Sequence, residues 1–299
     1  MRWLSGLTGL SRTRAKANRQ EEELNGAPSG KGEASWDRRS LAVYSTYCGS
    51  SANKTFNPAL VTDGHPHFFI SNNRDVLSEA QAVGWQPIYL DVEVSEDPVV
   101  SAGQAKLAKA LPHRFAELEG FDFTFYKDDK ISHSGAVLEA CVAKMCAQNA
   151  CISIRPHPFL SGNTLFEFGE AMMQPRYKAQ WDKSVAYITQ EIKDGYSLES
   201  TMYWTSAILR NMRHRDTRPL CETWYEHIGR CGIECQISFN FVAQRFSTIS
   251  LLPMDMDNPQ RTTSAAQMPL RDSAISGRNP SCHRRRVSAG AGKRVVAGP

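Results

Sequence analysis

The stretch Phe123-Thr-Phe-Tyr-Lys-Asp-Asp-Lys-Ile131 is the best-defined strand signal in the chain, and it ends directly in two carboxylates and a lysine. Adjacent acids are costly unless something neutralises them, and carboxylates at the end of a strand are common ligands of hard divalent cations. A nucleotide diphosphate can complete the shell of such a cation, with Lys127 or Lys130 adding positive charge. An ordinary acidic turn is the alternative reading of the same residues.

Upstream of this stretch, short β-rich runs alternate with helical periodicity. The runs are 41–47, 67–71 and 85–90, and the helical patterns flanking 123–127 are 101–119 and 135–148. This alternation predicts an α/β fold: a Rossmann-like, mostly parallel sheet with crossover helices. In such sheets, ligands bind beyond the carboxyl ends of the strands.

The second half is more helical, and the two ends of the chain have a different composition. Helices are expected at 164–174, 178–193, 217–229 and 235–246, with a strand at 202–209. Residues 1–40 read as a disordered leader and linker, 41–252 as the folded domain, and 253–299 as a disordered basic tail rich in Ser, Gly, Pro and Arg.

Charge argues against nucleic-acid recognition by the folded part. The 299 residues carry a formal charge of +4, but the two ends hold 16 of the 35 basic and 8 of the 31 acidic residues, so 41–252 carries −4. A binding face needs its basic residues held on a folded surface, so no specific nucleic-acid partner is expected.

No apolar run reaches the length of about 18 to 20 residues that a membrane span requires.

Eight cysteines and the amino-terminal composition bear on the compartment. No cysteine pair has the spacing of a zinc knuckle; Cys231 and Cys235 with His227 come nearest, and buried reduced thiols are preferred. A cytoplasmic location is therefore favoured. The first 20 residues hold five basic side chains and no acid, a composition that also fits an organelle transit peptide. A missing Golgi anchor is a further alternative.

Two other segments have residue types suited to a polar site. Lys106 and Lys109 share one face of the predicted helix that precedes the acidic strand, where they are either solvated or presented to the same site as the carboxylates. Arg155-Pro-His-Pro158 is a loop stiffened by two prolines, and it either aims Arg155 or His157 or simply closes the structure.

A series of ordered motifs from Leu41 to about Phe246 resembles a glycosyltransferase-like family formerly labelled domain of unknown function 616. The motifs are LAVYSTYCG at 41–49, HFFISNN at 67–73, Gly84-Trp85, AKALPHRF at 108–115, FTFYKDDKI at 123–131, ILRNMRH at 208–214, CETWY at 221–225 and ECQISFNFV at 234–242. The resemblance implies a glycosyltransferase type A-like fold, in which the first two strands hold a nucleotide and the aspartate after the central strand holds a metal-bound diphosphate.

The resemblance also implies roles for individual residues. Tyr44, Thr46 and Asn72 would line the nucleotide-sugar site, with Lys109 and Lys130 at the phosphates. Asp128, Asp129 and His214 would bind Mn²⁺ or Mg²⁺. Glu234 and Gln236 would act on the acceptor side as catalytic residues.

Two positions depart from the family pattern. The glycine after the strand-end aspartate is here Asp129, and the family's Arg-Asp-Gln is Glu234-Cys235-Gln236. One residue along a helix rotates a side chain by about 100°, so Glu234 does not simply replace the missing aspartate.

The expected function is that of a metal-assisted glycosyltransferase that moves a sugar from a nucleotide-diphosphate donor to a glycan or other hydroxyl acceptor. Two alternatives remain open. Cys235 favours a catalytically silent domain that binds a nucleotide sugar or glycan, and the carboxylates would also suit a metal-dependent hydrolase.

Overall fold

A computed structural model describes residues 40–51, 58–128, 131–160 and 162–253. Within them, seven strands form one sheet in the order β3-β2-β1-β4-β6-β5-β7. Their bounds are β1 Leu41–Thr46, β2 His67–Ser71, β3 Gln86–Tyr89, β4 Phe123–Lys127, β5 Ile152–Pro156, β6 Tyr203–Asn211 and β7 Ile249–Leu251. The predicted leader and tail lie almost wholly outside the described residues.

The sheet is mostly parallel, as the sequence predicts. Strands β3, β2, β1 and β4 run parallel to one another, and β5 pairs in parallel with β7. β6 alone among these strands runs antiparallel to both neighbours, β4 and β5. The amino end of β6 therefore lies beside the carboxyl ends of β4 and β5.

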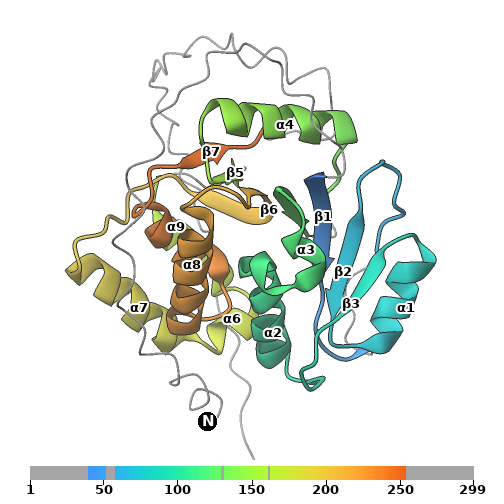
Figure 1. Ribbon diagram of the computed structural model, residues 1–299. Helices are drawn as coiled ribbons and strands as arrows, with labels where there is room; N and C mark the ends of the chain where they lie inside the picture. The colour runs from blue at the N-terminus through green and yellow to red at the C-terminus, as the bar shows by residue number, and fades with distance from the viewer. Residues whose placement is uncertain (1–39, 52–57, 129–130, 161, 254–299) are drawn as a thin grey trace, which may run out of the picture.

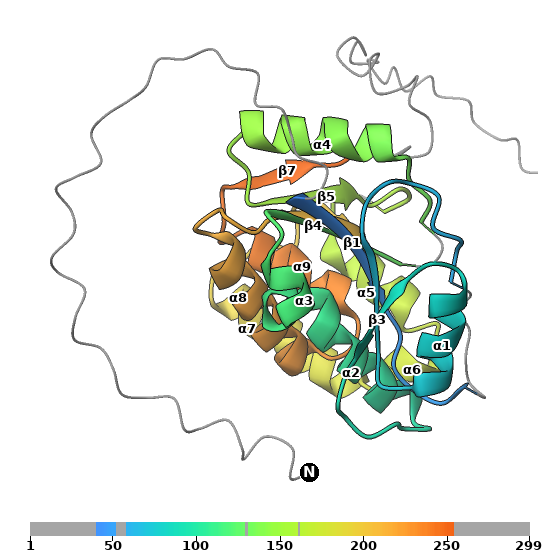
Figure 2. The same ribbon diagram turned by 45° about the vertical axis from the view of Figure 1, so that its right-hand side comes forward.

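Helices cover both faces of the sheet (Figures 1 and 2). α1 (Arg74–Ala82) and α4 (Gly135–Ala147) pack on the face to which Phe123 and Phe125 of β4 point. α2 (Pro98–Ala110), α8 (Thr217–Cys231) and α9 (Cys235–Ala243) pack on the face to which Tyr126 points. Successive side chains of a strand face opposite ways, so one apolar strand contributes to two cores.

The helix predicted over 101–119 is in fact broken. α2 ends at Ala110, a short 3₁₀ turn η3 covers Pro112–Arg114, and α3 covers Ala116–Glu119. Proline lacks an N–H and disfavours the helical conformation in the residue before it, and Leu111 accordingly has φ −119° and ψ 59°. The break ends α2 one residue after Lys109.

The region 164–193 contains three helices where the sequence predicts two: α5 (Thr164–Ala171), α6 (Pro175–Lys178) and α7 (Trp181–Lys193). Pro175 begins α6 at its first turn, a position where its missing N–H costs nothing. The short strand β7 is a further addition to the predicted elements. None of the described helices is long and apolar enough to cross a membrane.

Polar caps fix where the helices at the carboxyl edge of the sheet begin. Asn73 accepts hydrogen bonds from the backbone N–H groups of Asp75 and Val76 at the start of α1, directly after β2. Asp97 caps α2 in the same way, and Glu234 accepts from the Gln236 N–H at the start of α9. Each such cap contributes about 1 kcal/mol and sets the direction in which the helix leaves the sheet.

Candidate functional site

The order of the strands reverses between β1 and β4. β1 is followed by β2 on one side, whereas its neighbour on the other side is β4. Where the chain leaves two adjacent parallel strands in different directions, the connections diverge and leave a space at the carboxyl edge. Residues that the sequence predicts for the site lie at this edge.

Asp128 and Lys109 meet at this edge. Asp128 follows β4 directly, and its N–H donates to the carbonyl of Ser206 at 2.8 Å. Its Oδ1 accepts a hydrogen bond from the Tyr126 hydroxyl at 2.5 Å and lies 3.6 Å from Lys109 Nζ. The Lys109 side chain is 6% exposed and the Asp128 side chain 32% exposed, so the carboxylate is the more accessible partner.

The buried guanidinium of Arg210 holds the backbone of Lys109 in place. Arg210 of β6 donates to the backbone carbonyl of Lys109 at 2.7 Å and to the Tyr44 hydroxyl at 2.9 Å. Burial raises the pKa of Tyr44, although Arg210 opposes that shift, so the phenol stays neutral. Tyr44 is fully buried, so it supports the site from within the core and is not exposed to a ligand.

Lys106, one turn earlier on α2, faces the same group. Burial acts to lower the pKa of Lys106, but the surrounding Cys235, Tyr177, Glu234 and Asp128 together raise it above its ordinary value. Lys106 therefore stays protonated at neutral pH. The sequence left open whether Lys106 is solvated, and the structure makes it half-buried.

Asn72 and Thr46 also lie at the carboxyl edge. Asn72 is buried and uses its whole amide internally: Oδ1 accepts from the Gly49 N–H, and Nδ2 donates to Glu93 O and Gln104 Oε1. Thr46 is half-buried and donates to the carbonyl of Ile70 at 3.0 Å. Asn72 thus fixes the loops after β1 and β3, and Thr46 retains partial exposure.

A second polar group forms where α9 meets the amino end of β6. Gln236 donates through Nε2 to Glu167 Oε1 at 2.6 Å, and its Oε1 accepts from the Thr205 N–H at 3.3 Å. His157, in the loop after β5, has its Nε2 3.4 Å from Glu167 Oε2. Glu234, the cap of α9, is close enough to act on the titration of both Glu167 and His157.

The proton of His157 can be assigned from its neighbours. The N–H groups of Phe159 and Leu160 donate to Nδ1, so Nδ1 is the acceptor and Nε2 carries the hydrogen of the neutral ring. Burial lowers the pKa of His157, so the ring is neutral at pH 7 and points an N–H at Glu167.

Glu167 has the most strongly perturbed carboxyl pKa at this edge. Burial, followed by the charge of Glu234, raises the pKa of Glu167 to about 7, although the Gln236 hydrogen bond opposes the shift. A carboxyl group that titrates near neutral pH can accept and release a proton under working conditions. Sequence reasoning missed Glu167 because a single glutamate in the first turn of an amphipathic helix has no distinguishing pattern.

His214 is not brought to this group. It lies in the turn that follows β6, and because β6 is antiparallel, Asn211 pairs with Phe123 at the amino end of β4. The five residues of β4, with a rise of about 3.3 Å each, lie between that end and Asp128. Asp129 and Lys130 lie outside the described residues.

The fit of a divalent ion at Asp128 can be judged from its oxygen atoms. Asp128 is the described carboxylate at the end of β4, it is partly exposed, and its Oδ1 already contacts Tyr126 and Lys109. Hard cations accept one carboxylate together with phosphate oxygens of a substrate. With one described carboxylate and the Lys109 ammonium 3.6 Å from it, an ion fits here only together with the phosphate oxygens of a diphosphate.

No protein-family model matches this chain, and no curated protein matches it. Among solved structures, the chain is similar to the apo form of mouse xyloside xylosyltransferase 1, with 10% identity and a TM-score of 0.41 over 71% of this chain and 84% of that chain. A likeness of this size does not identify a donor, an acceptor or a catalytic residue.

Proposed function

We propose that this chain is a glycosyltransferase that moves a sugar from a nucleotide-diphosphate donor to a hydroxyl group of a glycan. The observation that carries the proposal is the meeting of Asp128 with Lys109 at the carboxyl edge of β4. The ordered motifs that resemble the glycosyltransferase-like family point the same way.

The donor end of the site would use the charges around Asp128. In the transfer, the bond between the sugar carbon and the diphosphate oxygen breaks, and the acceptor oxygen forms the new bond to that carbon. Negative charge develops on the departing diphosphate. Lys106 and Lys109, presented by one turn of α2, would stabilise that charge without moving, since Arg210 and Asp128 already hold Lys109.

A bound Mn²⁺ or Mg²⁺ would be held by Asp128 together with donor phosphate oxygens, and it would supply further positive charge to the leaving group. Thr46 would contact the nucleotide, and Asn72 and Tyr44 would hold the surrounding loops and strands.

The acceptor end would use the group on α9 and α5. The attacking hydroxyl must lose a proton, and Glu167 is the carboxyl whose pKa of about 7 suits this task. Gln236 and His157 orient Glu167 through N–H groups, and the nearby Glu234 raises its proton affinity. Glu167 would then take the role of the aspartate that the resembling family has at the position of Cys235.

The test is calorimetric titration of the full chain with a panel of nucleotides and nucleotide sugars, with and without Mn²⁺. Asp128→Asn is compared with Asp122→Asn, a change of the same kind just before the amino end of β4, where Asp122 pairs with the exposed Arg213. We expect Mn²⁺-dependent diphosphate binding that Asp128→Asn abolishes and Asp122→Asn preserves.

Two outcomes would overturn the proposal. A folded wild-type chain that binds no nucleotide under any condition would contradict a donor site at Asp128. Binding without transfer or donor hydrolysis, across a panel of glycan acceptors, would instead support the catalytically silent domain.

A further inference from the structure

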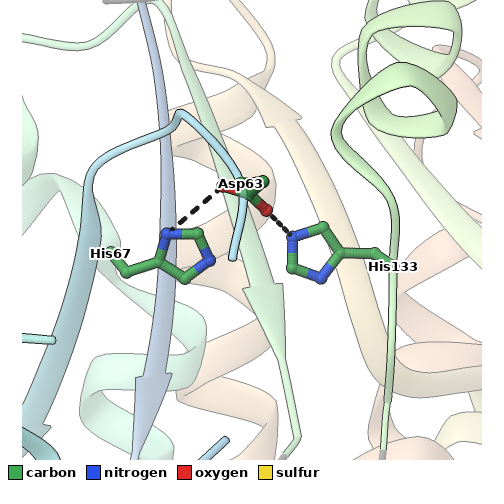
Figure 3. A group of neighbouring side chains, drawn as sticks. All are labelled: Asp63, His67 and His133. Carbon is green, nitrogen blue, oxygen red and sulfur yellow. Dashed lines mark ion pairs between the residues drawn. The ribbon is translucent and has the colours of Figure 1, made fainter. Parts of the chain in front are cut away.

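A further group of polar side chains, separate from those at the carboxyl edge, lies on the opposite face of the sheet from Lys109 and Tyr126. Asp63 is in the turn before β2, His67 is the first residue of β2, and His133 is in the connection from β4 to α4. One ligand atom of each lies within 4.8 Å of the others, and Figure 3 shows the three side chains converging from separate segments.

The carboxylate of Asp63 lies between the two imidazoles. Its Oδ2 is 2.8 Å from His133 Nε2, and its Oδ1 is 3.6 Å from His67 Nδ1. The side chains of Asp63, His67 and His133 are 14%, 3% and 4% exposed. The rings of His67 and His133 are stacked with their centroids 5.8 Å apart. Burying three polar groups so close together costs free energy unless hydrogen bonds or a bound cation compensate for the lost solvent contacts.

The hydrogen-bonding needs of His133 are only partly met. Its Nε2 contacts the Asp63 carboxylate at 2.8 Å but not in hydrogen-bond geometry, and its buried Nδ1 has no hydrogen-bond partner among the described residues. Phe125 packs against one side of the ring, with centroids 5.3 Å apart. A buried ring nitrogen without a well-formed hydrogen bond is costly, and a cation shared between Nε2 and the Asp63 carboxylate would give both ligand atoms a favourable partner.

His67 has the supporting hydrogen bond that metal-binding histidines usually have. Its Nδ1 lies 2.8 Å from the carbonyl oxygen of His65. A carbonyl only accepts, so Nδ1 carries the hydrogen of the neutral ring and the lone pair is on Nε2. Asp63 is held as well, because its Oδ1 accepts from the His65 N–H at 3.0 Å.

We propose that Asp63, His67 and His133 bind a divalent transition-metal ion of the Zn²⁺ type. Two imidazoles and one carboxylate are three protein ligands, and Zn²⁺ commonly adds a water to such a set. Ligands at about 2.1 Å from a tetrahedral ion are about 3.4 Å apart, whereas the ligand atoms here lie within 4.8 Å of one another, so binding requires separations to shorten by up to about 1.4 Å. Imidazole ligands favour Zn²⁺, Co²⁺ or Fe²⁺ over Mg²⁺, which prefers oxygen.

The ion would act as a clamp between two segments that are far apart in the sequence. His133 follows Asp128 by five residues, and the Ile131 N–H between them donates a hydrogen bond to the Asp128 carbonyl. Joining His133 to Asp63 and His67 ties the connection after Asp128 to the start of β2. The clamp does not depend on the proposed transferase activity.

One charge opposes the ion. Lys127 points to the same face, donates to the carbonyl of Ile131 at 2.9 Å, and is near enough to act electrostatically on His67. A dication beside one carboxylate and one ammonium binds less tightly than beside two carboxylates. We therefore expect an affinity in the micromolar range rather than that of a structural cysteine site.

The probe is Co²⁺, whose visible spectrum reports the ligand type. The full chain is titrated with Co²⁺ in excess Mg²⁺, and bound Co²⁺ is then displaced with Zn²⁺. We expect one equivalent of Co²⁺ with the bands of nitrogen and oxygen ligands. His133→Gln and Asp63→Asn should each weaken binding at least about tenfold. His113→Gln is the matched control, because His113 pairs with Glu222 elsewhere.

Thermal melts provide the second readout. Zn²⁺ should raise the Tm of the wild type and of His113→Gln, and leave the Tm of His133→Gln unchanged, because an ion stabilises only the state that binds it. Absence of Co²⁺ binding by folded wild type would overturn the proposal. A sulfur-to-cobalt charge-transfer band, or binding removed by His283→Gln in the tail and retained in His133→Gln, would also overturn it.

Discussion

Arg210 of β6 anchors the backbone of Lys109 across the core, with its guanidinium 2.7 Å from the Lys109 carbonyl oxygen. Arg210 is fully buried, and the Tyr44 hydroxyl accepts a second hydrogen bond from it at 2.9 Å. The same hydroxyl lies 3.3 Å from the Lys109 carbonyl oxygen. The position of Lys109 at the edge of the sheet is thus set by a charge in the interior.

Tyr44→Phe should weaken this anchor without changing the shape of the core. The substitution leaves one N–H group of a buried guanidinium without its acceptor, and an unsatisfied buried donor costs about 1–3 kcal/mol. We expect the free energy of unfolding in urea to fall by that amount.

Tyr89→Phe is the control for loss of a phenol. The Tyr89 side chain is exposed and contacts Arg74 through its ring, which phenylalanine retains. A change of less than about 0.5 kcal/mol is expected there. Equal effects of the two substitutions would contradict the anchoring role of Tyr44.

Lys106→Met and Lys109→Met should each reduce affinity for a nucleotide diphosphate. A hydrogen bond to a charged group contributes about 1.5–3 kcal/mol, so the expected loss is about tenfold to a hundredfold per lysine. Lys144→Met, on α4 at the other face of the sheet, removes the same charge away from the site. Titration calorimetry at two salt concentrations checks the prediction, because fewer phosphate contacts also make binding less sensitive to salt.

Lys109 and Asp128 show how far the sequence leads. The sequence places Lys109 on a helix before the acidic strand and leaves open whether it is solvated or presented to the carboxylates, and the structure brings its Nζ to 3.6 Å from Asp128. His214 shows where this reasoning fails. A strand pattern does not reveal the direction of the strand, and the antiparallel β6 carries His214 to the opposite edge.

Glu167 and the group of Asp63, His67 and His133 were beyond the reach of the sequence for a different reason. Each residue is unremarkable in its own segment, and its significance comes from partners far along the chain, such as Gln236 for Glu167. Pairings of this kind depend on how loops and helices pack after the sheet forms, which local periodicity does not encode.

The thiols should be slow to react in the folded protein. Burial raises the pKa of Cys48 to about 12 and of Cys141 and Cys151 to about 11, so little thiolate is present at pH 8. Among the described cysteines, Cys146 is the one that is half-buried. Mass spectrometry after brief alkylation should therefore find Cys146 modified before the other described cysteines, and modification of all of them only after unfolding.

The free energy of unfolding should depend on pH through Glu167. Its native pKa of about 7 lies above the ordinary value of 4.5, so the native state binds this proton more tightly than the unfolded state. The resulting stability is fully present below about pH 4.5 and is lost as the pH rises to about 7. Over this window the loss attributable to Glu167 is at most about 3 kcal/mol, at 1.36 kcal/mol per pH unit.

Glu167→Gln isolates this contribution, because glutamine keeps the size of the side chain and does not titrate. Urea unfolding at pH 5 and pH 8 should show a smaller decrease in stability for Glu167→Gln than for the wild type, whereas Glu117→Gln, an exposed change on α3, should follow the wild type. Glu234→Gln should also flatten the decrease, since the charge of Glu234 helps to raise the pKa of Glu167. An unchanged pH dependence in Glu167→Gln would mean that Glu167 is ionised throughout this range, and it would remove the basis for its role as the proton acceptor.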